Sequence, residues 1–184
     1  MIAALFVQTG GAYFGLPDVE PWDEARDARL YAGPHPVVAH PPCARWCQLA
    51  GLVEARYPYL KKGEDGGCFA SALASVRKWG GVLEHPAFTS AWPAYDLTEP
   101  RADGWIRTFD GGWVCEVSQR PFGHRARKLT WLYYVGSSPP RHSIGVGRRR
   151  WRAPLGARIT VRARSRSWAS VSGPLRRMPF GICC

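Results

Sequence analysis

The sequence VVAHPPCARWC, residues 37–47, joins an apolar run to a rigid segment that carries a thiol. The run 36–40 has the composition of a buried β-strand. Pro41 and Pro42 cannot donate backbone hydrogen bonds to a neighbouring strand, so the strand is expected to end before them. The stiff Pro-Pro pair would hold the thiol of Cys43 in a fixed direction. A lone cysteine is more often a packed residue, so its reactivity depends on its neighbours.

A second strand is followed by another polar group. The sequence GGVLEHP, residues 80–86, predicts a strand over 81–86 that ends at a proline. Glu84 follows three apolar positions, which favours a hydrogen-bonding or proton-donating group in a cleft. The alternative is a solvent-facing strand end.

Helices are predicted between the strands. Residues 66–81 have apolar side chains at the spacing of an amphipathic helix, and Gly80 and Gly81 would end it. A short helix is expected over 23–31. Further strands are expected over 3–7, 113–117 and 129–135. Strands that alternate with helices predict an α/β sheet whose site lies at the carboxyl ends of the strands.

The bulk properties favour a single cytoplasmic domain. A chain of 184 residues suits one domain with an appendage. No apolar run approaches the roughly 18–20 residues that cross a membrane. The start MIAALFVQTGG lacks the features of a signal peptide, so its six cysteines are expected to be reduced thiols, ligands or nucleophiles.

Charge is concentrated in one part of the chain. Of the formal net charge of +11, all comes from residues 135–184, which hold 11 Arg and no Lys, Asp or Glu. Such a segment cannot easily bury enough apolar surface to order itself. It is either a nucleic-acid-binding arm or an out-of-frame reading of GC-rich DNA, and the two interpretations stay open.

Four segments together resemble the DNA cytosine-C5 methyltransferases. The resemblance covers roughly residues 3–135 and is strongest to short methyltransferase-like proteins of bacteriophages and prophages. It implies a reduced Rossmann-like three-layer α/β sheet of the S-adenosylmethionine-dependent methyltransferase type over 1–136. The arginine-rich composition predicts a poorly ordered tail over 137–184. The matching segments are PPC (41–43), EHP (84–86, with His85 for Asn), QRPFGHRAR (119–127) and LFVQTGGAYFGL (5–16).

The resemblance implies a role for each matching residue. Cys43 would add to C6 of a pyrimidine, which makes C5 nucleophilic, and Glu84 would stabilise the adduct at N3. A base in duplex DNA would have to be flipped out to reach them. The substrate-binding residues would be Pro41, Pro42, Arg125 and Arg127, and Phe6, Gly10 and Gly11 would bind S-adenosylmethionine.

The cofactor half of this expected site is short. Only 32 residues separate Gly10 from Cys43, where the family fits two further strand–helix units. Glu20 or Asp23 is the candidate for the ribose-binding acid. The expected partner is DNA or a pyrimidine nucleotide, with no membrane. Since nothing between 135 and 184 resembles a target-recognition domain, a separate DNA-recognition protein is a further candidate partner.

Three alternatives remain at this point. The same fold could use another one-carbon donor or a free nucleotide, or it could be a non-catalytic nucleic-acid-binding protein. A metal site is the third, because His40, Cys43 and Cys47 could be joined by His85 or Cys68, although the spacing only partly resembles zinc sites. Trp46, near the proposed nucleophile, is the candidate for stacking on a base.

Overall fold

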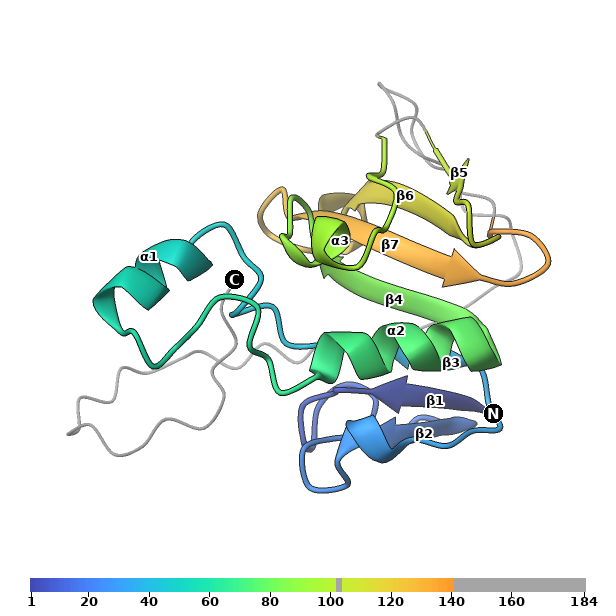
Figure 1. The fold of residues 1–184 in the computed structure, drawn as a ribbon. Coiled ribbons are helices and arrows are strands. Elements are labelled where there is room, and N and C mark those ends of the chain that lie inside the picture. Colours follow the sequence, from blue (N-terminus) through green and yellow to red (C-terminus); the bar gives the residue numbers. More distant parts are fainter. Residues whose placement is uncertain (102–103, 141–184) are drawn as a thin grey trace. The chain divides into compact units, whose positions relative to one another are not determined.

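The computed structural model describes residues 1–101 and 104–140. These residues form a mixed seven-stranded sheet in the order β2-β1-β3-β4-β7-β6-β5 (Figure 1). The first four of these strands run parallel, β7 and β5 run antiparallel to them, and β6 runs with them. The strands are β1 (Ile2–Leu5), β2 (Val19–Trp22), β3 (Val37–Ala39), β4 (Gly81–Pro86), β5 (Ile106–Arg107), β6 (Trp113–Ser118) and β7 (Leu129–Val135). The predicted α/β class is confirmed.

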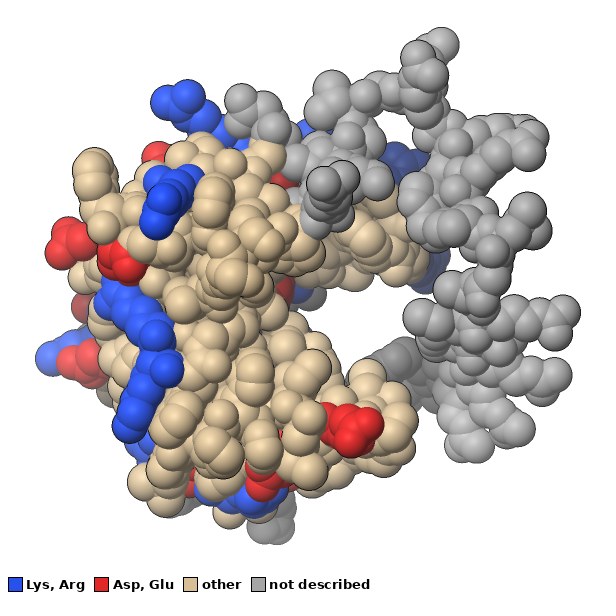
Figure 2. All heavy atoms as spheres, turned by 90° about the vertical axis from the view of Figure 1, so that its right-hand side faces the viewer, with Lys and Arg blue, Asp and Glu red and all other residues tan. Residues whose placement is uncertain are grey.

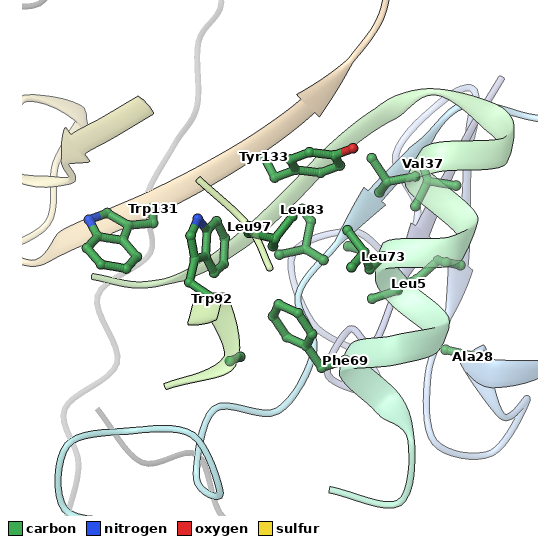
Figure 3. Close-up of a cluster of buried hydrophobic side chains, with 14 of the residues drawn as sticks. Leu5, Ala28, Val37, Phe69, Leu73, Leu83, Trp92, Leu97, Trp131 and Tyr133 are labelled. Atoms are coloured by element: carbon green, nitrogen blue, oxygen red, sulfur yellow. The ribbon is translucent and has the colours of Figure 1, made fainter. Parts of the chain in front are cut away.

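Helix α2 (Cys68–Trp79) covers one face of the sheet, over β3 and β4 (Figure 1). Its apolar side packs into the core with Phe69, Leu73 and Val76 fully or almost fully buried, as Figure 3 shows for the first two. The helix ends where predicted, because Gly80 has a φ of 76° and its N–H bonds to the Val76 carbonyl.

The residues of β4 alternate between the two faces of the sheet. Leu83 is buried in the core that α2 covers, and the ring of His85 contacts the ring of Phe69 with centroids 5.2 Å apart. Glu84 lies between them in the strand and therefore faces the opposite side of the sheet. The strand also continues to Pro86, so Glu84 is inside β4 and not at its end. It does lie one residue beyond the last β3–β4 pair, Ala39 with Leu83.

Two segments differ from the predicted elements near the amino terminus. The expected helix over 23–31 is a turn followed by the short 3-10 helix η1 (Ala28–Leu30), because Asp27 has a φ of 49° and interrupts the helical backbone. Strand β2 was not predicted, since Pro21 weakens a strand assignment. It lies at the edge of the sheet, where a proline is tolerated.

The remaining elements are short. They are α1 (Ala50–Arg56), α3 (Ala91–Ala94) and the 3-10 helix η2 (Arg120–Phe122), and neither these nor β5 was predicted from the sequence. None of the described helices combines the length and the apolar character required to cross a membrane. Residues 141–184, which contain most of the predicted tail, lie outside the described residues.

Candidate functional site

The order of the strands creates a crevice at the carboxyl ends of β1 and β3. The chain runs from β1 to β2 on one side of it, and then crosses to β3 on the other side. Loops that leave neighbouring parallel strands in opposite directions open a crevice where α/β proteins bind ligands. A hollow of about 210 Å³ lies at this position. It is lined by Phe6, Val7, Gln8, Gly11, Ala12, Tyr13 and His40.

The glycine-containing turn after β1 forms the wall of this hollow. Gly10 has a φ of 67°, which favours glycine, and the Gly11 N–H bonds to the Gln8 carbonyl at 2.8 Å. A Cβ on Gly11 would lie only 2.8 Å from that carbonyl oxygen. The turn itself therefore accounts for both glycines. Of the predicted cofactor residues, Phe6 and Gly11 line the hollow, and Gly10 directly precedes Gly11 in the sequence.

A chain of hydrogen bonds joins the hollow to Glu84. Tyr13 Oη lies 2.6 Å from His40 Nε2, and His40 Nδ1 lies 3.0 Å from Glu84 Oε2. On its other side, Glu84 Oε1 accepts a hydrogen bond from Gln119 Nε2 at 3.2 Å. Gln119 also donates to Thr130 Oγ1 at 2.8 Å. Five polar side chains from separate segments thus form one network on the face of the sheet opposite α2.

The surroundings of Glu84 keep it ionised. Burial alone would raise the pKa of this carboxyl, but the hydrogen bond and charge of His40, with the charge of Lys128, lower the pKa below its usual value. The pKa of Tyr13 is raised, first by burial and then by the negative charge of Glu84. Tyr13 is therefore a neutral hydroxyl beside a carboxylate at neutral pH.

Cys43 lies three residues beyond His40, where the chain leaves β3. Cys43 is half-buried, and its backbone carbonyl accepts hydrogen bonds from the Trp46 and Cys47 N–H groups, both at 2.9 Å. The turn over 43–47 therefore begins at the predicted nucleophile. Pro41 is buried and Pro42 is half-buried, so the segment before the thiol packs against the protein.

Trp46 is part of the core and not a platform for a base. Its side chain is only 6% exposed, and its indole N–H donates to Asp65 Oδ2 at 2.8 Å. The Trp46 carbonyl also accepts a hydrogen bond from the Ser90 N–H at 2.9 Å. The prediction that Trp46 stacks on a base is therefore wrong, because the ring anchors the turn after Cys43 to the start of α2.

The segment before β7 reaches the site with a different residue from those predicted. Arg125 and Arg127 are exposed in the loop between η2 and β7. The side chain of this segment that bonds to Glu84 is Gln119, and Lys128 acts on Glu84 through its charge. The roles assigned to Arg125 and Arg127 stay predictions.

The residues considered for a metal site do not come together as one. Within residues 1–101 and 104–140, no three His, Cys, Asp or Glu side chains are placed to hold a metal ion. His85 is fully buried, and burial lowers its pKa to about 4, although the charge of Glu84 and the Pro42 backbone oppose that shift. Its ring packs between Phe69 and Trp92. His85 is therefore a neutral core residue behind the Pro41–Pro42 segment.

Sequence reasoning missed part of this network. The sequence predicts His40 only as a candidate metal ligand, although its place directly after the apolar run of β3 puts it at the edge of the sheet where the site was expected. Nothing in the sequence around Tyr13 or Thr130 predicts contact with His40 or Gln119.

No family model matches this chain, and no match was found among curated proteins or solved structures. The function of this chain therefore has to be inferred from the site itself. The fold contributes the place of the site, at the carboxyl ends of β1 and β3, and the hydrogen-bonded network contributes its chemistry.

Proposed function

We propose that this protein activates a pyrimidine base by addition of the Cys43 thiolate, in the manner of the DNA cytosine-C5 methyltransferases. The observation that carries the proposal is the place of Glu84. This carboxylate lies in β4 beside the end of β3, where His40 and Gln119 hold it by hydrogen bonds. Cys43 follows β3 in the sequence, three residues after His40. A thiolate and an oriented carboxylate are the two groups that the reaction requires.

The Cys43 thiol loses its proton to water, and the thiolate sulfur forms a bond to C6 of the pyrimidine. The electrons of the C5–C6 double bond form a C4–C5 double bond, those of the N3–C4 double bond move to N3, and N3 takes up one proton that solvent supplies through Glu84. C5 becomes a nucleophile in the resulting enamine. When the adduct collapses, the S–C6 bond breaks and N3 loses its proton.

The described residues supply only part of a site for S-adenosylmethionine. The hollow of about 210 Å³ is smaller than the roughly 300–1,000 Å³ of most ligand pockets. Asp23 follows β2, where an acid binds ribose in dinucleotide-binding folds, but it already accepts hydrogen bonds from Thr9 Oγ1 and the Arg26 N–H. The methyltransferase type of sheet, and this donor, therefore stay predictions.

Exchange of the C5 hydrogen tests the proposed activation without any donor. An oligonucleotide that contains 5-deuterio-deoxycytidine should lose its deuterium to water in the presence of the protein. The enamine takes up a solvent proton at C5, and the C5–D bond then breaks with loss of the deuteron to water, which regenerates the enamine before the adduct collapses. The Cys43→Ser variant should lose the activity, whereas Cys47→Ser should retain it. No exchange by the native protein on single-stranded, duplex or mononucleotide substrates would overturn the proposal.

The identity of the donor is a separate measurement. Calorimetry of the native protein with S-adenosylmethionine tests the predicted cofactor, and DNA containing 5-fluorocytosine tests methyl transfer through a trapped adduct. Exchange at C5 without S-adenosylmethionine binding would favour the second candidate, a relative of the same fold that uses another one-carbon donor. The small hollow is the observation that favours this candidate.

A further inference from the structure

In the proposed reaction His40 only holds Glu84 in place, and Tyr13, which bonds to His40, has no assigned part. Tyr13 lies in the loop after β1, which lines the hollow, and His40 directly follows β3. The two side chains are joined at 2.6 Å, and the second nitrogen of His40 lies 3.0 Å from Glu84. A structural role for two half-buried side chains does not require such a continuous connection to a half-buried carboxylate.

The hydrogen bonds are compatible with a stored proton on His40. If the ring is an imidazolium, Nδ1–H donates to Glu84 Oε2 and Nε2–H donates to Tyr13 Oη. If the Nδ1 proton moves to Glu84, the ring becomes neutral and Nε2–H still donates to Tyr13. The contact with Tyr13 is therefore the same in both states, and only the proton between His40 and Glu84 changes place.

The groups around Glu84 keep it ionised, so the proton that it gives to N3 has to come from another side chain. His40 faces it from the end of β3, Lys128 from the segment before β7, His85 from β4 itself and Tyr13 from the loop after β1. The hydrogen bond with His40 and the positive charge of Lys128 hold Glu84 in its ionised form at neutral pH, in which it has no proton to give to N3. His40 is the group in direct hydrogen-bond contact with Glu84 that can carry one.

We propose that His40 is a positioning residue that lends a proton to the pyrimidine N3 through Glu84, while Tyr13 holds its ring. On addition of the thiolate, the Nδ1 proton passes to Glu84 Oε2 and the carboxyl gives a proton to N3. On collapse of the adduct, N3 returns the proton to Glu84 and Glu84 returns it to His40. Gln119 keeps the second carboxylate oxygen in place throughout. This inference rests on the proposed function.

The C5 exchange reaction measures this role in matched histidine variants. His40→Gln should slow exchange by about 10- to 100-fold, within the range of general acid–base catalysis, with little change in the KM for the oligonucleotide. His124→Gln is the control, because His124 lies exposed in the loop before β7 and should behave as the native protein.

Two further variants separate proton transfer from mere support. Imidazole added to the His40→Gly variant should restore part of the lost rate, which a packing role would not allow. Tyr13→Phe should slow exchange only about threefold, because the proton itself stays on His40. Exchange by His40→Gln within twofold of the native rate, or a loss that appears only in KM, would overturn the inference.

A measurement on the protein alone distinguishes failure of the relay from failure of the proposed function. The ¹⁵N chemical shifts of the His40 ring should change in Glu84→Gln, while those of His124 should not. If the native protein shows no C5 exchange but this coupling is present, the proposed function fails and the His40–Glu84 proton pair remains. Unchanged His40 shifts in Glu84→Gln would overturn the proton pair itself.

Discussion

Gly81 is the residue at which the parallel half of the sheet tolerates no side chain. It begins β4 with a φ of 112°, and a Cβ built on it would lie 1.9 Å from the Val37 carbonyl oxygen of β3. Gly81 thus serves two purposes, since it follows Gly80 at the end of α2 and allows β3 and β4 to pair in register. The position of Glu84 beside His40 depends on that register.

Gly81→Ala should therefore cost about 3 kcal/mol or more of the free energy of unfolding, because both the backbone conformation and the contact with Val37 are unfavourable. Urea denaturation followed by circular dichroism measures the loss. Gly51→Ala is the matched control, since Gly51 lies in α1 with open space around it and should gain about 0.5–1 kcal/mol. Equal effects of the two substitutions would contradict this account.

At the scale of elements, one buried carboxylate joins the turn after Cys43 to the beginning of α2. Asp65 Oδ2 accepts hydrogen bonds at 2.8 Å from the Trp46 indole and from the Phe69 N–H, and Asp65 Oδ1 accepts one at 2.9 Å from the Gly67 N–H. Helix N–H groups in the first turn have no partner within the helix. The carboxylate thus satisfies α2 and fixes the turn that carries the proposed nucleophile.

Asp65→Ala should lower the free energy of unfolding by about 3 kcal/mol, because buried donors lose an ionised acceptor. The same variant should lose C5 exchange activity more than its stability explains, as the turn over 43–47 loosens. Asp65→Asn keeps one acceptor oxygen and should cost less than Asp65→Ala. Stability in Asp65→Ala equal to that of the native protein would contradict the proposed connection.

A second connection between elements lies at the other end of α2 and is sensitive to pH. Burial alone would raise the pKa of Asp110, but hydrogen bonds from Thr108, Tyr133, Arg77 and the Gly112 N–H lower it to about 2. The distances from Asp110 Oδ2 are 2.7 Å to Arg77 Nη2 and 2.8 Å to Tyr133 Oη. These bonds attach the β5–β6 turn to α2 and β7.

Because the pKa of Asp110 is lower in the folded chain than the ordinary value near 3.8, its stabilising contribution is complete above that value. The contribution is lost as the pH falls through the folded pKa of about 2. The native protein should thus exceed Asp110→Asn in free energy of unfolding at pH 5, and the difference should shrink toward pH 2. Urea titrations at several pH values measure it, and a difference that grows on acidification would contradict the prediction.

At the scale of the whole molecule, the charge of the described part is balanced. Residues 1–134 hold 14 basic and 14 acidic residues. Figure 2 shows one face of this part, on which basic and acidic side chains are dispersed around a broad uncharged area. Electrostatic attraction to nucleic acid is therefore expected to come from the arginines after residue 140 if that segment is a functional arm.

Replacing Arg148, Arg149 and Arg150 by Gln should reduce the slope of log K against log salt for duplex DNA by up to about 2.7, since each phosphate contact contributes about 0.9. A matched triple substitution of Arg56, Lys61 and Lys62, exposed near α1, should change the slope less. Fluorescence anisotropy at several salt concentrations gives both slopes. The reverse order would place the DNA-binding charge on the described part.

The sequence by itself determined the long, regular elements. The apolar period over α2, the glycines that end it, and the apolar runs of β3, β4 and β7 are local signals, and each element is present in the structure. Local signals failed at two short segments. Pro21 argues against a strand, yet β2 forms at the edge of the sheet, and Asp27 interrupts the helix predicted over 23–31, so that only η1 forms. They also failed for α1, whose seven residues contain a glycine and show no clear period.

Only the tertiary structure decided the composition of the site. The sequence placed His40 and Glu84 after separate apolar runs, and the β3–β4 register brought them to 3.0 Å. Tyr13 and Gln119 reach the same network from loops whose paths depend on the order of the strands. The physical reason is that hydrogen bonds between distant segments depend on how the sheet is assembled, which no neighbouring residues encode. PPC at 41–43 and EHP at 84–86 named the candidate nucleophile and carboxylate, and the fold added His40, three residues before Cys43, as the partner of Glu84.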